Sequence, residues 1–90
     1  MQKSSEISGE IMETIKKCAE LALERKLDSF SPGLSLTDDL NMESIHLVAF
    51  QVEIEDAFQI EFDPLQDDFY EIFRTVFSVY QTVEKKLLEK

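Results

Sequence analysis

The side chains that could take part in chemistry gather between Asp39 and His46. This stretch holds one hydroxyl, Ser44, beside the acids Asp39 and Glu43. From Ser44 to Phe58 there is no Gly or Pro and apolar residues recur at helical spacing, so we predict a helix with Ser44 as its N-cap. A helix N-terminus favours negative charge, so a phosphate esterified to Ser44 would be stabilised there. The hydroxyl could instead serve only as a cap.

Ser44 lacks the neighbours of a catalytic serine. A hydrolase needs a base beside its nucleophile, commonly in a Gly-x-Ser-x-Gly turn. The single imidazole, His46, follows by two residues and therefore points about 200° around the helix, away from the hydroxyl. We predict that the chain is not an enzyme and that His46 is a surface or helix-capping residue, with a role in partner selection left open.

The acids before Ser44 imitate part of a calcium loop. Asp39, Asn41 and Glu43 fall at its first, third and fifth positions. The sixth position needs Gly but holds Ser44, and the twelfth needs Glu but holds Phe50. One cysteine and one histidine also cannot form a structural zinc site. We therefore predict no metal site.

Three segments in register resemble one family. The stretch Asp39-Leu40-Asn41-Met42-Glu43-Ser44-Ile45 resembles the Asp-Leu-Gly-x-Asp-Ser-Leu motif of acyl carrier proteins, whose serine receives 4′-phosphopantetheine. The segment Glu55-Asp56-Ala57-Phe58-Gln59-Ile60-Glu61-Phe62 is similar to the family's acidic helix end with its following Phe and Glu-Ile pair. Thr75-Val76 matches the start of its last helix. The resemblance covers about Ile7 to Val83.

The chain departs from the family pattern at several positions. Asn41 replaces Gly, Glu43 replaces Asp and Ile45 replaces Leu, while His46 and Ala49 stand where many members carry acids. These departures support an alternative in which the chain is an unmodified, carrier-like helical module that binds a protein.

The resemblance implies a non-catalytic carrier. A separate phosphopantetheinyl transferase would attach 4′-phosphopantetheine from coenzyme A to Ser44, using magnesium held mainly by the transferase. The thiol of that arm would carry an acyl group as a thioester and present it to acyl-loading and acyl-processing enzymes of fatty-acid, polyketide or related biosynthesis. The cargo and the pathway stay open.

The helix that begins at Ser44 has two apolar faces. Leu47, Phe50, Ile54, Ala57 and Phe58 share the predicted core side. Ile45, Val48 and Val52 cluster at about 40° to 100° from Ser44, beside Glu55 and Asp56. Either another helix covers this second stripe, or it is a docking surface for enzymes with basic patches. We predict that Ile45, Val48, Val52, Glu55 and Asp56 dock partners and that Asp39 and Glu43 help the transferase.

Composition sets the remaining bounds. Ninety residues, 43% hydrophobic and 31% charged, predict one small globular domain. The resemblance implies that this domain, over residues 1–90, is acyl-carrier-like. The net charge of −10 opposes binding to nucleic acid and favours basic partners. Cys18 is the only cysteine, which excludes an intrachain disulfide and favours a core position. No apolar run approaches a membrane span or a signal peptide core, so we expect a cytoplasmic location. We also expect a monomer.

The elements that would position Ser44 form an all-α, small four-helix bundle, with three longer helices, a short third helix and a long loop after the first. We predict the helices from Ser4 or Ser5 to about Lys26, from Ser44 to Phe58, from Asp63-Pro64 to about Ile72, and from Thr75 onward. Ser31-Pro32-Gly33 interrupts the helical pattern, and Leu34, Leu36 and Leu40 would pin the loop to the core. Phe58, Phe73, Val76 and Tyr80 could line a space for an acyl chain, or their bulk could close it.

Overall fold

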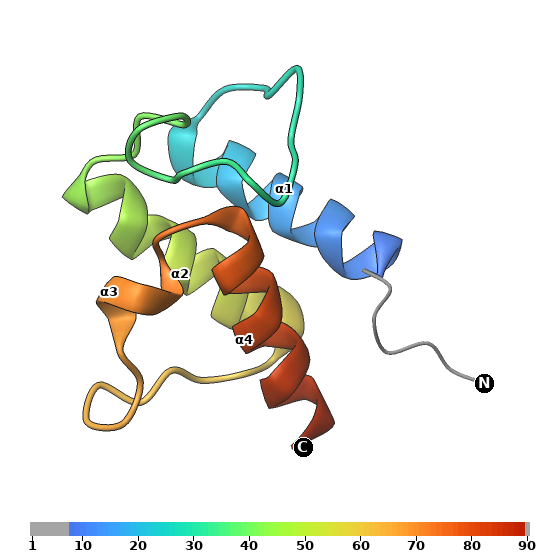
Figure 1. Cartoon of the computed structure of the whole chain (residues 1–90), viewed down its shortest axis with the longest axis vertical. Helices are drawn as coiled ribbons and strands as arrows, with labels where there is room; N and C mark the ends of the chain where they lie inside the picture. The colour runs from blue at the N-terminus through green and yellow to red at the C-terminus, as the bar shows by residue number, and fades with distance from the viewer. Residues whose placement is uncertain (1–7, 90) are drawn as a thin grey trace.

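A computed structural model describes residues 8–89 of the chain and has four helices within that range. They are α1 (Gly9–Leu23), α2 (Ser44–Phe58), α3 (Phe69–Ile72) and α4 (Val76–Leu88). α1 packs against α2 and α4, and α3 packs against α4 (Figure 1). Three longer helices, a short third helix and a long loop between α1 and α2 confirm the predicted all-α bundle.

The first helix of the described residues begins with a serine cap. Ser8 is its N-cap, and the Ser8 hydroxyl accepts a hydrogen bond from the Ile11 N–H at 3.3 Å. The Ser8 N–H donates to the Tyr80 hydroxyl at 2.8 Å, which fastens this end to α4. The described helix begins at Gly9, and the predicted start at Ser4 or Ser5 lies outside the described residues.

The first helix ends before the predicted Lys26. Its last residue is Leu23, because Glu24 adopts a left-handed conformation with φ of 59°. The N–H groups of Glu24 and Arg25 then bond to the Glu20 carbonyl, the second at 3.2 Å. A left-handed residue that redirects two N–H groups to one carbonyl is a common way to end a helix. The chain after Leu23 therefore leaves α1 in a defined direction.

The core is built from one face of each long helix and from the loop. Seven large side chains are less than 2% exposed: Phe50, Ile15, Leu36, Ile54, Val76, Val79 and Val83. Cys18 is buried as predicted, and Ala22, one turn further along α1, is buried as well. On α2 the predicted core side is confirmed for Phe50 and Ile54, but Ala57 is exposed. Ala57 lies near the last turn of α2, where its small side chain has little apolar area to bury.

Aromatic rings fill the space between α2, α3 and α4. Phe50, Phe62, Phe69 and Phe73 form a chain of edge-on and tilted contacts with centroid distances of 5.4 to 6.0 Å. The proposed lining residues Phe73, Val76 and Tyr80 are buried, and Phe58 packs against the same core. Such contacts stabilise aromatic pairs beyond the area they bury. In this structure the rings pack against one another between the helices.

The long loop is tied to the start of α4 by backbone hydrogen bonds. The Leu36 N–H donates to the Arg74 carbonyl at 3.1 Å, and the Val76 N–H donates to the Leu34 carbonyl at 3.0 Å. These bonds flank a bridge between Ser35 and Thr75. Leu36 and Leu40 are buried as predicted, whereas Leu34 is partly buried against the core. The loop is thus a fixed part of the fold.

The third helix is shorter than predicted. The chain after Asp63-Pro64 makes turns instead of a continuous helix, and α3 begins only at Phe69 after the N-cap Asp68. The reason is local competition: the Asp63 carboxylate accepts from the Leu65 N–H, and the Asp67 carboxylate accepts from the Asp63 N–H at 2.6 Å. Asp side chains commonly replace helical bonds with such turns.

The start of α4 agrees with the prediction. Thr75 is the N-cap, its hydroxyl accepts from the Ser78 N–H at 3.0 Å, and the Ser78 hydroxyl accepts from the Thr75 N–H at 3.0 Å.

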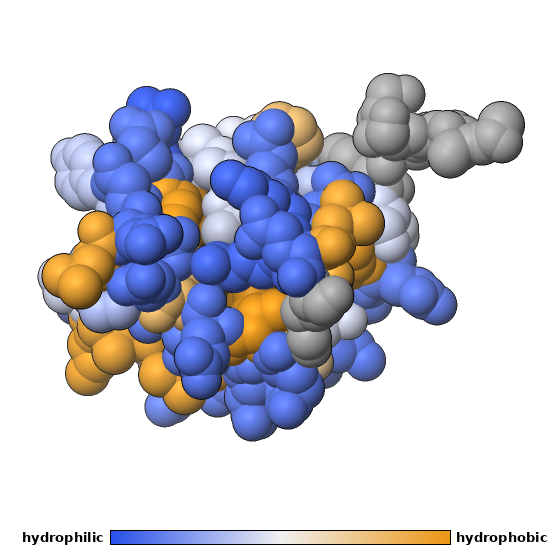
Figure 2. All heavy atoms as spheres, turned by 90° about the horizontal axis from the view of Figure 1, so that it is seen from below, coloured by the Kyte–Doolittle hydropathy of each residue, from blue (hydrophilic) through white to orange (hydrophobic). Residues whose placement is uncertain are grey.

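Between residues 8 and 89, no helix is both long enough and apolar enough to span a membrane. On one face of the molecule, apolar side chains reach the surface between larger hydrophilic areas (Figure 2).

An ion pair fastens the turn before α3 to α4. The Lys86 ammonium lies 3.0 Å from the Asp67 carboxylate, with both side chains 19% exposed, and sits 5.6 Å from the centroid of the Phe62 ring. Partial burial alone would raise the pKa of Asp67, but the Asp63 N–H and Lys86 outweigh burial and lower the pKa from its usual value. This pair therefore favours the folded state when Asp67 is ionised.

We expect a double-mutant cycle of Asp67→Asn and Lys86→Met to give a coupling of about 1 kcal/mol in the free energy of unfolding at pH 7. Because the pKa of Asp67 is lower in the folded chain, the coupling should be complete above about pH 4 and should fade as the pH falls through the folded value. The matched variant Lys85→Met should couple to Asp67→Asn much more weakly. Equal coupling for both lysines would show that the close contact has no special effect.

Candidate functional site

Ser44 is the first helical residue of α2. The sequence pattern predicts it at the N-cap, the position before the first helical residue. The N-cap is Glu43, in an extended conformation with φ of −94° and ψ of 177°, and its carbonyl accepts from the Leu47 N–H at 2.9 Å. Ser44 is exposed, and within residues 8–89 its hydroxyl makes no hydrogen bond. The prediction of Ser44 as N-cap is wrong because Glu43 is the residue that turns into the helix. The hydroxyl lies beside the N–H groups of the first turn and is not used to cap them.

His46 takes the capping role instead. Its Nδ1 accepts a hydrogen bond from the Glu43 N–H at 2.9 Å. A side chain in the first turn that reaches back to the N-cap N–H is half of a capping box. Because Nδ1 is the acceptor, the imidazole carries its proton on Nε2. His46 thus stabilises the start of α2, as the prediction of a helix-capping residue has it.

Asn41 explains how the chain manages without the glycine of the carrier motif. Its φ is 58°, in the left-handed region that glycine adopts without cost. Asn is one of the few side chains that enters this region readily. The substitution of Asn for Gly therefore keeps the backbone turn that leads into α2.

Buried side chains on either side of Asn41 hold that turn in place. Leu40 is 4% exposed and Met42 is 3% exposed. The Met42 N–H donates to the Leu36 carbonyl at 2.9 Å. With apolar anchors before and after it, the left-handed residue cannot move independently of the core. Ser44 follows Met42 by two residues, so its position depends on the same anchors.

The second apolar face of α2 is uncovered. Ile45, Val48 and Val52 are 72%, 61% and 54% exposed, and we call these three residues the apolar strip. No other helix of the described residues packs over it, so the interpretation in which a neighbouring helix covers this stripe is wrong. The apolar strip begins next to Ser44 and runs along the solvent-facing side of α2.

Two of the acids predicted to meet partners also hold the backbone. The Asp39 carboxylate accepts from the Ser35 N–H at 2.8 Å. The Glu55 carboxylate accepts from the Phe62 N–H at 2.9 Å and so fixes the turn after α2. Asp56 is exposed next to the apolar strip. Substitution of Asp39 or Glu55 would therefore disturb turns as well as charge.

Cys18 belongs to the core. It is 3% exposed, and burial, with the Glu53 and Asp56 carboxylates nearby, raises the pKa of the Cys18 thiol to about 11. The nucleophilic form of cysteine is the thiolate, which is scarce at neutral pH when the pKa is this high. Cys18 is thus an unreactive core residue.

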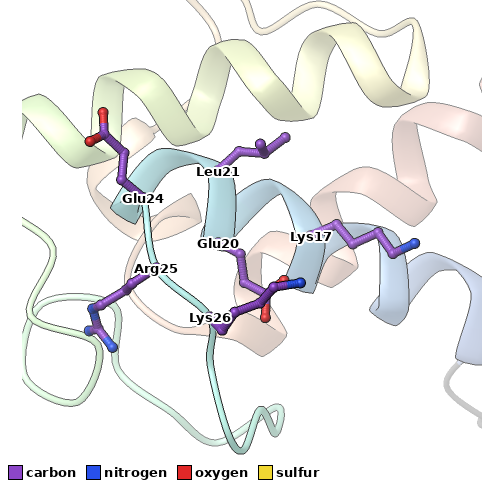
Figure 3. A pocket seen from close by; sticks show the side chains of 6 residues that line it. All are labelled: Lys17, Glu20, Leu21, Glu24, Arg25 and Lys26. Atoms are coloured by element: carbon purple, nitrogen blue, oxygen red, sulfur yellow. The ribbon is translucent and has the colours of Figure 1, made fainter.

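One feature at the end of α1 has no counterpart in the sequence predictions. An open hollow of about 660 Å³ lies there (Figure 3), lined by Lys17, Glu20, Leu21, Glu24, Arg25 and Lys26. Leu21 is 62% exposed because it does not lie on the face of α1 that buries Ile15, Cys18, Ala19 and Ala22. Among residues 8–89, no group of His, Cys, Asp and Glu side chains is arranged to hold a metal ion.

Comparison with known proteins gives one match. A family model described as "Phosphopantetheine attachment site" matches residues 13–83. The matched range contains the whole loop before Ser44, all of α2 and α3, and most of α1 and α4. No curated protein and no solved structure matches the chain.

The left-handed turn at Asn41 can be tested by substitution. We expect Asn41→Gly to change the free energy of unfolding by less than about 0.5 kcal/mol, because glycine adopts a positive φ without strain. Asn41→Val should cost about 1–2 kcal/mol, because a β-branched side chain is strained in the left-handed region. Urea unfolding of the two variants measures the difference. Equal stability of the Gly and Val variants would show that this backbone position tolerates any side chain.

Proposed function

The chain belongs to the phosphopantetheine attachment site family, whose domains carry covalently bound 4′-phosphopantetheine in acyl carrier proteins, and from this we propose that Ser44 is its attachment residue. Domains of this family are carriers and not catalysts. We further propose that the whole chain, residues 1–90, is one carrier domain that holds acyl groups as thioesters.

The position of Ser44 is the observation that supports this proposal. Its hydroxyl is exposed and is adjacent to the first-turn N–H groups of a 15-residue helix. A phosphodiester on this oxygen would lie at the positive end of the helix dipole. The turn before it is held by buried Leu40 and Met42, so the attachment point would be presented in a constant orientation.

The attachment reaction needs groups from a partner. The Ser44 oxygen would attack the phosphate of coenzyme A that bears pantetheine, a phosphodiester would form, and 3′,5′-adenosine bisphosphate would leave. His46, the nearest imidazole in sequence, has its Nδ1 occupied by the Glu43 N–H. A base and a magnesium ion must then come from a phosphopantetheinyl transferase.

The attached group supplies a flexible arm with a terminal thiol that holds the acyl cargo. The chain supplies solubility, identity and docking. The apolar strip lies exposed beside Ser44, with Glu43 and Asp56 near its two ends. The net charge of −10 favours transferases and acyl-loading or acyl-processing enzymes that have basic patches. We place these enzymes in fatty-acid, polyketide or related biosynthesis.

A second candidate function uses the same surface. The apolar strip would also suit an unmodified helical module that binds a protein, and the motif departures at Asn41, Glu43, His46 and Ala49 would fit it. Two of these departures have structural roles, since Asn41 adopts the left-handed turn and His46 caps α2. We therefore prefer the carrier.

Intact mass spectrometry tests the attachment. After incubation with coenzyme A, magnesium and a promiscuous phosphopantetheinyl transferase, the parent chain should gain one phosphopantetheine group. Ser44→Ala should gain none, whereas the matched variant Ser35→Ala should still be modified. An adduct on Ser44→Ala would reject Ser44 as the attachment residue. A folded parent chain that gains no adduct with several transferases would favour the unmodified module.

Thiol labelling gives an independent readout of the same product. The folded, unmodified chain should react very slowly with a maleimide near pH 7, because its single thiol is buried with a raised pKa. The modified chain should take up one maleimide rapidly, on the new arm. Rapid labelling of the unmodified chain would show that Cys18 is accessible after all.

The apolar strip can be tested with a pair of surface variants. Val48→Ser should raise the KM of the transferase for the carrier about fivefold or more, because truncation at a buried interface position typically costs over 1 kcal/mol. The control Leu65→Ser removes an apolar side chain that is 94% exposed but lies outside the strip, and should leave KM unchanged. Both variants should keep the parent's stability within about 0.5 kcal/mol. An equal KM for the two variants would remove the strip from the interface.

A further inference from the structure

Arg25 leaves the end of α1 from a fixed backbone position. The preceding residue, Glu24, is the left-handed residue that ends the helix, and the Arg25 N–H bonds to the Glu20 carbonyl at 3.2 Å. The Glu20 carboxylate then accepts from the Leu27 N–H at 2.9 Å, so the backbone is also held two residues later. Leu27 itself is buried. The backbone position from which the Arg25 side chain extends is therefore well defined.

The head of the same side chain contacts the loop that precedes Ser44. The Arg25 Nη2 donates to the Leu40 carbonyl at 3.1 Å, a partly buried hydrogen bond between residues 15 apart in sequence. In Figure 3 the Arg25 side chain points away from Lys17 and Lys26, although all three line the same hollow. Hydrogen bonds from a charged donor are stronger than neutral ones. Arg25 thus ties α1 to the loop.

From Leu40 the connection to Ser44 is short and held at each step. Asn41 has its left-handed φ, the Met42 N–H bonds to the Leu36 carbonyl, and the Glu43 N–H bonds to His46. No segment between Leu40 and Ser44 is long enough to absorb a displacement. A shift of the Leu40 carbonyl would therefore be passed on to the start of α2.

We propose that Arg25 is a positioning residue for the modification of Ser44: its hydrogen bond to the Leu40 carbonyl keeps the loop in the conformation that the transferase recognises. This inference rests on the proposed function, because it concerns the same serine. Arg25 acts through the loop and does not touch the reacting atoms.

The sign of the expected effect distinguishes this role from a simple charge effect. Removal of a cation makes a carrier of net charge −10 more negative, which by charge alone should strengthen its encounter with a basic enzyme. Loss of the tether should do the opposite. When only a fraction of the carrier is competent for binding, the apparent affinity falls by that fraction.

The test compares Arg25→Gln with Lys26→Gln, which remove the same charge from adjacent exposed residues. We expect Arg25→Gln to raise the KM for Ser44 modification about threefold to tenfold with little change in kcat. Lys26→Gln should leave KM unchanged or lower it. Equal KM values for the two variants would overturn the proposal, because charge alone would then account for the result.

Amide hydrogen exchange tests the tether without any modification step. In the unmodified protein, Arg25→Gln should speed exchange severalfold at the Leu40, Met42 and Glu43 amides. The first two N–H groups have acceptors in the loop, and the Glu43 N–H donates to His46 Nδ1. Exchange at core amides of α4, such as Val83, should not change. Unchanged exchange in the loop, or an increase that spreads equally through α4, would contradict a local tether.

The two measurements separate failure of this inference from failure of the proposed function. If the parent chain is not modified at all, the carrier proposal fails and hydrogen exchange alone decides whether Arg25 holds the loop. If the parent is modified but Arg25→Gln behaves like Lys26→Gln in both measurements, the carrier proposal stands and the role of Arg25 is rejected.

Discussion

The structure depends on the attachment of the long loop to the helical core. Hydrogen bonds join the loop to the start of α4, and Leu36, Leu40 and Met42 bury their side chains beneath it. A loop of this length would ordinarily be mobile and variable. Here its end is held closely enough that α2 begins at a set place, and an exposed serine at that place has a constant orientation.

The core and the surface of α2 serve different purposes. On the inner side, Phe50 and Ile54 are fully buried, and the ring of Phe50 contacts Phe73 in a network of aromatic side chains. On the outer side, the apolar strip stays exposed to water. Exposed apolar surface is unfavourable in free energy, and no contact within the described residues offsets this. An uncovered apolar surface next to a candidate attachment residue is what a protein needs if it must dock with several enzymes in turn.

Much of this architecture was predictable from the sequence, because the helices of the bundle follow regular apolar spacing. The burial of Cys18 follows from such spacing. The start of α4 was predictable for a different reason, because Thr75 is a common N-cap residue. The predictions failed where local hydrogen bonds competed: Asp63 and Asp67 formed turns instead of a longer third helix, and Glu43 took the N-cap position expected for Ser44. The link from Arg25 to Leu40 joins distant segments, so no local pattern could reveal it.

The most direct measurement is peptide mass mapping of this protein purified from the cells that make it. The peptide that contains Ser44 should carry phosphopantetheine, and a portion of it should carry an additional acyl group that hydroxylamine removes, as expected for a thioester. An unmodified Ser44 under every growth condition, or an arm attached to another residue, would contradict the carrier function.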